Sequence, residues 1–440
     1  PFHFECHFLT MSQRCWKLHT HHGLVDGIGQ RLAQNTERRD VTYRFTLLDS
    51  PVVNAFALPG GYVYVTRGIL SIANTEDELA SVLAHEIGHV TARHQSERYS
   101  TGVLTSLGAS IAGAVIGSAG VSQALSVGTN LYMSSYSRDQ ESQADELGIR
   151  YLSRAGYDPY AMSHFLSQLD RYDHLKDKAG SKSGAANIFA THPVTSERVG
   201  MSSSLATKYP AVKPSAQSHE VYLAKIRGMI FGGNMAQGFV RRGMFYHPDL
   251  GLAFSIPKGF DTVNQPDQVI AKGSDGSLLV MDMARSNVTN DPVEFMSREW
   301  LKGKAVTSNP ERMTVNGMQG ATLSVKGTVN NAPADLRVFA INWTPRDFVR
   351  FQIVLPQNAS RQSVEDLKRT TYSLRRMSAE EKRSVKPTTI QVITATAGDT
   401  VQSLARQMDV EGDQVSWFRV VNGLGAQDKV YSGVSYKIIR

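Results

Sequence analysis

The sequence predicts an α+β protein: a mainly helical N-terminal domain with a small β-sheet, then a mainly β domain, then a terminal βααβ unit. Three observations support this order. Helical periodicity dominates the first part of the chain, short alternating segments follow, and residues 390–440 combine both patterns. A chain of 440 residues that is 41% hydrophobic and 20% charged can bury the cores of about three domains.

Charge and cysteine usage exclude several classes of protein. Lys plus Arg at 47 against Asp plus Glu at 40 gives a net charge of +7 without a long basic run, so nucleic acid is not expected as a partner. Cys6 and Cys15 are the two cysteines, which excludes a disulfide framework. They lie among histidines, but their spacing matches no zinc finger. Residues 1–23 are expected to be a poorly ordered leader, and no export signal is visible there.

Shifts in composition predict the domain boundaries. The expected segments are the leader 1–23, a first domain 24–205, a linker 206–218, a mainly β accessory domain 219–377, a linker 378–389 and the βααβ unit 390–440.

Local signals define the elements of the first domain. Val41 to Leu48 and Tyr62 to Thr66 alternate like strands and are expected to pair as a hairpin. Thr75 followed by Glu78 is a capping box, and it predicts a helix from Glu76 into the nineties. A second helix is predicted from Arg138 to Ala155, before Gly156.

The stretch 99–137 contains no Asp, Glu, Lys or Arg. A membrane span is one interpretation. Small residues, glycines and recurring Ser, Thr, Gln and Asn favour a hairpin of small-residue helices instead. This stretch and residues 176–187 are the two candidates for a lid, on their glycine content.

His85, Glu86 and His89 form an H-E-x-x-H pattern on the first predicted helix. Four residues are slightly more than one turn, so both imidazoles lie on one face within reach of one Zn²⁺. Glu86 lies beside them, where it can act on a water molecule. Two surface histidines would explain these letters, but not their place on a capped amphipathic helix.

A third ligand would complete a catalytic zinc site and leave one position for water. His94 is one candidate, but the metzincin spacing is absent, so it is expected at the surface or in support of a ligand. Glu141 on the second helix is the better candidate. Asp145 lies one turn further on the same face, where it could orient a ligating histidine.

These motifs resemble the gluzincin metallopeptidases related to the CAAX prenyl protease and HtpX, metallopeptidase family forty-eight, and most of all its soluble bacterial cell-envelope members. The resemblance covers Leu24 to Met201. The motifs that carry it are, in order, Asn54-Ala-Phe-Ala-Leu-Pro-Gly-Gly, His85 to His89, Glu141 with Ala144 and Asp145, Thr191-His192-Pro193, and Arg198. It implies a zincin-type peptidase domain that is a zinc metalloendopeptidase.

The resemblance also implies roles for individual residues. One Zn²⁺ per chain would be held by His85, His89 and Glu141, with Glu86 as the general base. Asp145 would orient a ligand, His192 would stabilise the oxyanion, and Arg198 would support the site. A structural histidine before a proline remains the alternative for His192. The cleft would be lined by Asn54, Ala55, Phe56 and Ala57.

An edge strand at Asn54 to Leu58 would bind the substrate as an added strand, which favours extended polypeptide. Residues 390–440 resemble a divergent LysM module, a peptidoglycan-binding fold, through Ala397-Gly-Asp-Thr, Leu404-Ala405, Asn422-Gly-Leu and Tyr436-Lys-Ile. Turn chemistry in any βααβ unit would also explain Gly-Asp-Thr.

Together these features predict a zinc endopeptidase of the bacterial periplasm or cell envelope that cleaves unfolded or misassembled proteins. Membrane association is expected to be peripheral at most. Two alternatives stay open. One is a noncatalytic peptidoglycan-binding or chaperone-like scaffold, and the other is a zinc peptidoglycan amidase.

Overall fold

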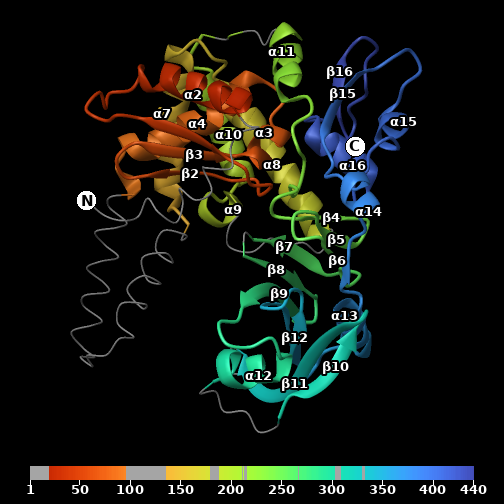
Figure 1. The fold of residues 1–440 in the computed structure, drawn as a ribbon. Helices are drawn as coiled ribbons and strands as arrows, with labels where there is room; N and C mark the ends of the chain where they lie inside the picture. The colour runs from red at the N-terminus through yellow and green to blue at the C-terminus, as the bar shows by residue number, and fades with distance from the viewer. Residues whose placement is uncertain are drawn as a thin grey trace, which may run out of the picture. The chain divides into compact units, whose positions relative to one another are not determined.

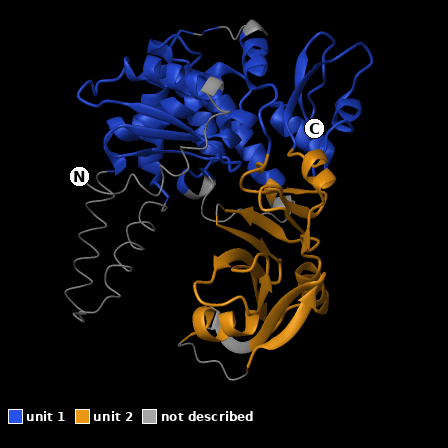
Figure 2. Cartoon of the chain, in the orientation of Figure 1, with its two compact units in different colours: residues 1–175, 184–231, 388–440 blue, residues 176–183, 232–387 orange. Residues whose placement is uncertain are grey.

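A computed structural model describes residues 19–95, 135–178, 188–210, 212, 216–265, 267–302, 309–329 and 332–440. The chain divides into two compact units (Figure 2). One consists of residues 1–175, 184–231 and 388–440, and the other of residues 176–183 and 232–387. The predicted α+β class is confirmed, because a helical N-terminal region with a small sheet precedes a mostly β region. The predicted domain boundaries stay predictions.

A three-stranded sheet lies in the first unit, with strands β1 (Arg44–Leu48), β2 (Ala55–Leu58) and β3 (Tyr62–Thr66) in the order β1-β3-β2. The expected hairpin between the first and last of these is wrong, because they pair in parallel. The hairpin partner of β3 is β2, across a turn in which Gly60 and Gly61 have φ of 93° and 87°. The chain between β1 and β3 makes the crossover that a parallel pair needs.

Helices surround this sheet (Figure 1), and α2 packs on β1 while α4 packs on β2 and β3. The helices described in this unit before residue 231 are α2 (His19–Ala33), α3 (Arg67–Ile72), α4 (Glu76–Thr91), α7 (Arg138–Arg154), α8 (Ala161–Lys178), α9 (Ile188–Thr191), α10 (Ser196–Ala206) and α11 (Ala216–Ile226). The two helices predicted for the first domain are therefore present as α4 and α7.

Only one of the two hydrogen bonds of the predicted capping box is present at the start of α4. Thr75 Oγ1 accepts from the N–H of Glu78 at 3.1 Å, as predicted. The Glu78 carboxylate instead accepts from the N–H of Asn74 at 2.7 Å, one residue before the cap. Ser137 and Gln140 form a complete capping box at the start of α7.

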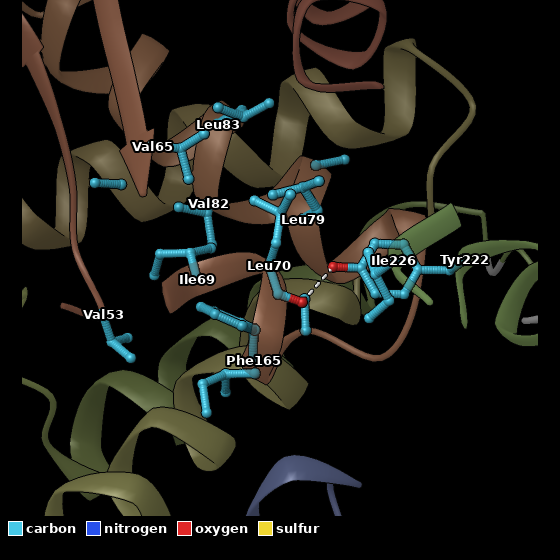
Figure 3. Close-up of a cluster of buried hydrophobic side chains, with 14 of the residues drawn as sticks. Val53, Val65, Ile69, Leu70, Leu79, Val82, Leu83, Phe165, Tyr222 and Ile226 are labelled. Carbon is cyan, nitrogen blue, oxygen red and sulfur yellow. Dashed lines mark hydrogen bonds between the residues drawn. The ribbon is translucent and has the colours of Figure 1, made fainter. Parts of the chain in front are cut away.

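The core of this unit fills the space between α3, α4 and the sheet (Figure 3). Val65, Ile69 and Leu83 are fully buried there. The Tyr222 hydroxyl from α11 donates to the carbonyl oxygen of Leu70 at 2.8 Å, so the polar end of this buried ring is satisfied. The core thereby buries α4 from Leu79 to Val90.

The second unit is mostly β. A seven-stranded antiparallel sheet has the order β10-β11-β12-β13-β9-β8-β7, and a four-stranded sheet has the order β14-β6-β5-β4. The strands are β4 (Phe239–Arg241), β5 (Met244–His247), β6 (Leu252–Ser255), β7 (Asp261–Asn264), β8 (Gln268–Lys272), β9 (Leu278–Arg285), β10 (Glu311–Val315), β11 (Met318–Val329), β12 (Ala332–Asn342), β13 (Asp347–Pro356) and β14 (Arg375–Arg376). Its helical segments are α12 (Pro292–Phe295), the π-helix η2 (Met296–Trp300), α13 (Arg361–Tyr372) and α14 (Ala379–Ser384).

The last residues form the predicted βααβ order with β15 (Ile390–Thr394), α15 (Val401–Ala405), α16 (Gln414–Val421) and β16 (Ser435–Ile439). The two strands pair antiparallel. This element is packed into the first unit: Gln168 Nε2 on α8 donates to the carbonyl oxygen of Val420 at 3.1 Å. The resemblance to LysM stays a prediction.

Some predicted features fall outside the described residues. These are most of the charge-free stretch 99–137, residues 179–187 of the second lid candidate and residues 1–18 of the leader. Among the helices that the structure describes, none combines the length and apolar character needed to cross a bilayer.

Candidate metal centre

Helices α4 and α7 meet at two glycines. A Cβ atom placed on Gly88 would lie 2.7 Å from the carbonyl oxygen of Ala144. One placed on Gly148 would lie 3.2 Å from the backbone nitrogen of His85. Because neither glycine has a side chain, the two backbones approach closely, and the polar faces of both helices share one buried space.

Four buried side chains converge in this space: His85 and His89 from α4, Glu141 from α7 and His192 just after α9. Each offers one ligand atom, and these atoms lie within 4.8 Å of one another. The Nε2 atoms of His85 and His89 are 3.0 Å apart, and Glu141 Oε1 lies 3.3 Å from Nε2 of His89. Imidazole nitrogens with one carboxylate are a donor set that Zn²⁺ prefers, so these residues fit the predicted metal.

Asp145 and Arg198 hold two of these groups in place. The Asp145 carboxylate lies 2.8 Å from His85 Nδ1, which directs Nε2 of that ring into the cluster. Arg198 donates to both Asp145 oxygens, at 2.9 and 2.8 Å, and its Nη1 lies 2.5 Å from Glu141 Oε2. The sequence-predicted support residue therefore contacts both carboxylates.

The charges of the cluster shift its pKa values. Burial opposes ionisation of Glu141, but the neighbouring imidazoles of His192 and His85 outweigh it and hold the pKa of this carboxyl well below its usual range. Burial likewise opposes ionisation of Asp145, and the Arg198 guanidinium outweighs it and lowers the pKa of Asp145. Both carboxylates are therefore anionic, as a cation site requires.

Glu86 points into the same space beside the edge strand β2. Burial raises the pKa of Glu86, while the imidazoles of His192 and His85 and, to a smaller extent, the backbone N–H of Ala57 act in the opposite direction. Ala55 and Ala57 face the buried side of β2, whereas Phe56 faces the other side and stacks on Tyr64 with ring centroids 5.0 Å apart. The predicted cleft residue Ala57 thus lies where its backbone acts on the predicted base.

His192 joins the cluster directly. Its Nδ1 lies 2.9 Å from Glu141 Oε1 and 3.1 Å from His85 Nε2, and its Nε2 lies 3.5 Å from Glu86 Oε1. The sequence resemblance placed this ring at the oxyanion of the reaction. The structure places it between the predicted base and the predicted ligands, in the position of a fourth ligand.

Three residues near the cluster carry contacts that the motifs did not predict. The Tyr136 ring stacks on His89 with centroids 3.9 Å apart. His94 is buried and its Nδ1 lies 2.9 Å from His89 Nδ1, while its Nε2 lies 2.9 Å from Gln143 Oε1. His94 therefore supports a predicted ligand, which is one of the two expectations for it. Nothing in the local pattern marks Tyr136 or Gln143.

Part of the chain is similar in sequence to known peptidases. Residues 21–204 match the sequence profile of Peptidase family M48. The chain is 33% identical over 283 residues to the Beta-barrel assembly-enhancing protease of Escherichia coli (strain K12), covering 59% of this chain and 56% of that protein. The protein of that name from Yersinia pestis is 33% identical over 213 residues, covering 46% and 42%.

A mitochondrial relative is also similar. The Mitochondrial metalloendopeptidase OMA1 of Schizosaccharomyces pombe is 32% identical over 176 residues, covering 40% of this chain and 50% of that protein. The chain spans about half the length of the relatives it matches. The resemblance predicted from the motifs is thereby confirmed: residues 21–204 are similar to the metallopeptidases of family M48.

Proposed function

We propose that this protein is a zinc-dependent endopeptidase that hydrolyses peptide bonds in unfolded or misassembled cell-envelope proteins. The observation that carries this proposal is the buried cluster of His85, His89, Glu141 and His192, whose ligand atoms lie within 4.8 Å of one another. Its donor set, its anionic carboxylates and the adjacent Glu86 are the parts that metal-dependent hydrolysis requires.

The residues of the centre have different roles in the proposed hydrolysis. When bound by His85, His89 and Glu141, Zn²⁺ would supply a Lewis acid that polarises the scissile carbonyl and acidifies a water molecule. Glu86 takes the proton of the attacking water at its carboxylate and returns it to the leaving amine. We assign His192 to the oxygen that gains negative charge, because a closed set of four protein ligands leaves no position for water.

The substrate is proposed to be extended polypeptide. Strand β2 is at the edge of the described three-stranded sheet, and the backbone of Ala57 reaches Glu86. A substrate strand that pairs with this edge would present its main chain beside the base with little demand on side-chain identity. Two relatives whose names describe a protease in β-barrel assembly support an envelope substrate and a location in the bacterial periplasm or envelope.

Peptidoglycan is the proposed partner of residues 390–440. Because this element packs into the first unit, the test uses the full chain and purified cell-wall sacculi. We expect the protein to sediment with the sacculi and to be released by soluble glycan fragments. A protein that stays in the supernatant would remove this partner and leave the peptidase proposal intact.

The test of the catalytic proposal is Glu86→Gln. This variant keeps the shape of the side chain but removes the base, so we expect one Zn²⁺ per chain by elemental analysis and loss of cleavage of unfolded casein. Glu146→Gln is the matched control, because Glu146 is exposed on α7. Equal cleavage by Glu86→Gln and wild type would contradict the proposal.

The same assays separate the alternatives. A noncatalytic scaffold predicts no casein cleavage by the wild-type protein, even with zinc bound. A peptidoglycan amidase predicts release of peptides from digested sacculi with casein left intact. The Glu86 environment favours peptide bonds, because the neighbouring edge strand offers main-chain pairing to a polypeptide.

A further inference from the structure

We propose that Gln143 and His94 set which ring nitrogen of His89 carries its hydrogen, and that they thereby act as positioning residues for metal binding. The inference rests on the proposed function, since it concerns the lone pair that His89 offers to a cation. It goes beyond the ligand set, because neither residue contacts the centre of the cluster.

The chain takes an uncommon conformation to bring His94 to this place. Helix α4 ends at Thr91, and Arg93 then adopts a left-handed conformation with φ of 61°. A residue other than glycine adopts this conformation only at an energetic cost. After this turn the side chain of His94 is buried and contacts His89.

The hydrogens along this chain of contacts can be assigned from the surface inward. Gln143 is oriented with its carbonyl oxygen Oε1 2.9 Å from His94 Nε2, and because this oxygen only accepts, this orientation places a hydrogen on His94 Nε2. In a neutral ring, His94 Nδ1 is then an acceptor. It faces His89 Nδ1 at 2.9 Å, so that nitrogen carries the hydrogen.

This placement of hydrogens determines which nitrogen of His89 can bind a cation in the cluster. With its hydrogen on Nδ1, the neutral His89 ring has a bare Nε2, and this is the atom that lies 3.0 Å from His85 Nε2. If a donor replaced the Gln143 oxygen, His94 Nε2 would accept and His94 Nδ1 would carry the hydrogen. His89 Nδ1 would then accept, and His89 Nε2 would carry the hydrogen. The Tyr136 ring stacks on one face of His89.

The two ligand histidines of α4 are thus oriented by different chemistry. His85 Nδ1 meets a carboxylate, Asp145, directly. His89 Nδ1 meets the imidazole of His94, and the group proposed to set the hydrogens, Gln143, is on an exposed position of α7. A polar partner on the outer nitrogen of a metal-binding histidine commonly contributes about ten- to a hundredfold in metal affinity.

The experiment uses substitutions at Gln143, since an exposed position can change without unfolding the protein. Gln143→Glu keeps an acceptor, Gln143→Met removes it, and Gln143→Lys supplies only donors. Zinc affinity is measured by competition with a chromophoric chelator, and the His89 tautomer by ¹⁵N NMR of histidine-labelled, metal-free protein. Glu146→Met, exposed on the same helix, is the control.

We expect Gln143→Glu to bind zinc at least as tightly as wild type, Gln143→Met to lose about tenfold, and Gln143→Lys to lose up to about a hundredfold. The NMR signal of His89 should move toward the other tautomer in Gln143→Lys. Equal zinc affinity and an unchanged tautomer in all three variants would overturn the inference. A wild-type protein that binds no zinc would instead overturn the proposed function.

Discussion

Two buried polar clusters in the first unit invite comparison. One is the cluster of His85, His89, Glu141 and His192, and the other surrounds Lys437 on β16. Lys437 has no exposed surface, yet its ammonium donates to the carbonyl oxygens of Ser71, Ile72 and Ala73 at 2.9, 3.2 and 2.7 Å. These carbonyls end α3, where the helix dipole favours a cation.

The difference lies in how donors and acceptors match. Around Lys437, three hydrogens meet three oxygens, and the cluster is complete without any further group. In the histidine cluster, the inner ring nitrogens face one another and share one carboxylate. Equal burial therefore has different meanings: complementary groups indicate a structural contact, whereas converging ligand atoms are the arrangement that a cation site requires.

The largest expected effect is on the histidine cluster, through Glu141→Gln. The amide removes the negative charge and is a poorer ligand, so zinc affinity should fall by more than about a hundredfold, the upper range for a partner outside the ligand set. Chelator competition measures it, with exposed Glu146→Gln as the control on the same helix. Retention of tightly bound zinc would show that Glu141 is not a ligand.

Lys437→Met should act on stability and not on the metal. The substitution removes a donor from the buried carbonyl oxygens of Ser71 and Ala73, while that of Ile72 still accepts from Asn74 and Gln168. It should cost about 1–3 kcal/mol in the free energy of unfolding for each buried acceptor left without a partner. Urea denaturation measures it, with exposed Lys429→Met as the control. Unchanged stability, or a loss of zinc from the folded variant, would contradict the structural role assigned to the Lys437 cluster.

Zinc itself should stabilise the protein by a smaller amount. At a free concentration of about 100 times the dissociation constant, a ligand that binds only the folded state adds about 2.7 kcal/mol. Urea denaturation with and without a chelator should show this increment in wild type and in Lys437→Met. The increment should vanish in Glu141→Gln, and an equal increment there would place the metal elsewhere.

Much of the centre could be predicted because its signals are local. The i, i+4 spacings of His85 with His89 and of Glu141 with Asp145 place each pair on one helix face. The missed features depend on distant parts of the chain. Lys437 is a charged residue in a strand pattern, and its partner Ser71 is 366 residues away.

Two other features could not be predicted because they depend on backbone conformation that the sequence does not mark. The left-handed turn at Arg93 has no glycine to mark it, so the return of His94 to His89 could not be predicted from its spacing. The parallel pairing of β1 with β3 depends on a short intervening strand, β2, that pairs with β3 from the other side.

The prediction with the smallest expected effect concerns Gly88, the residue before His89 in the H-E-x-x-H motif. A methyl group there would stand 2.7 Å from the Ala144 carbonyl oxygen, which is backbone and cannot rotate away. Gly88→Ala should therefore push α7 from α4, at a cost of about 1–3 kcal/mol in the free energy of unfolding. It should also weaken zinc binding, because Glu141 moves with α7 while both histidines stay on α4.

Gly200→Ala on α10 is the control, since no atom lies within 4 Å of the added Cβ. Unchanged zinc affinity in a destabilised Gly88→Ala would mean that the ligands adapt to a shift between the helices, and that the close crossing serves packing alone.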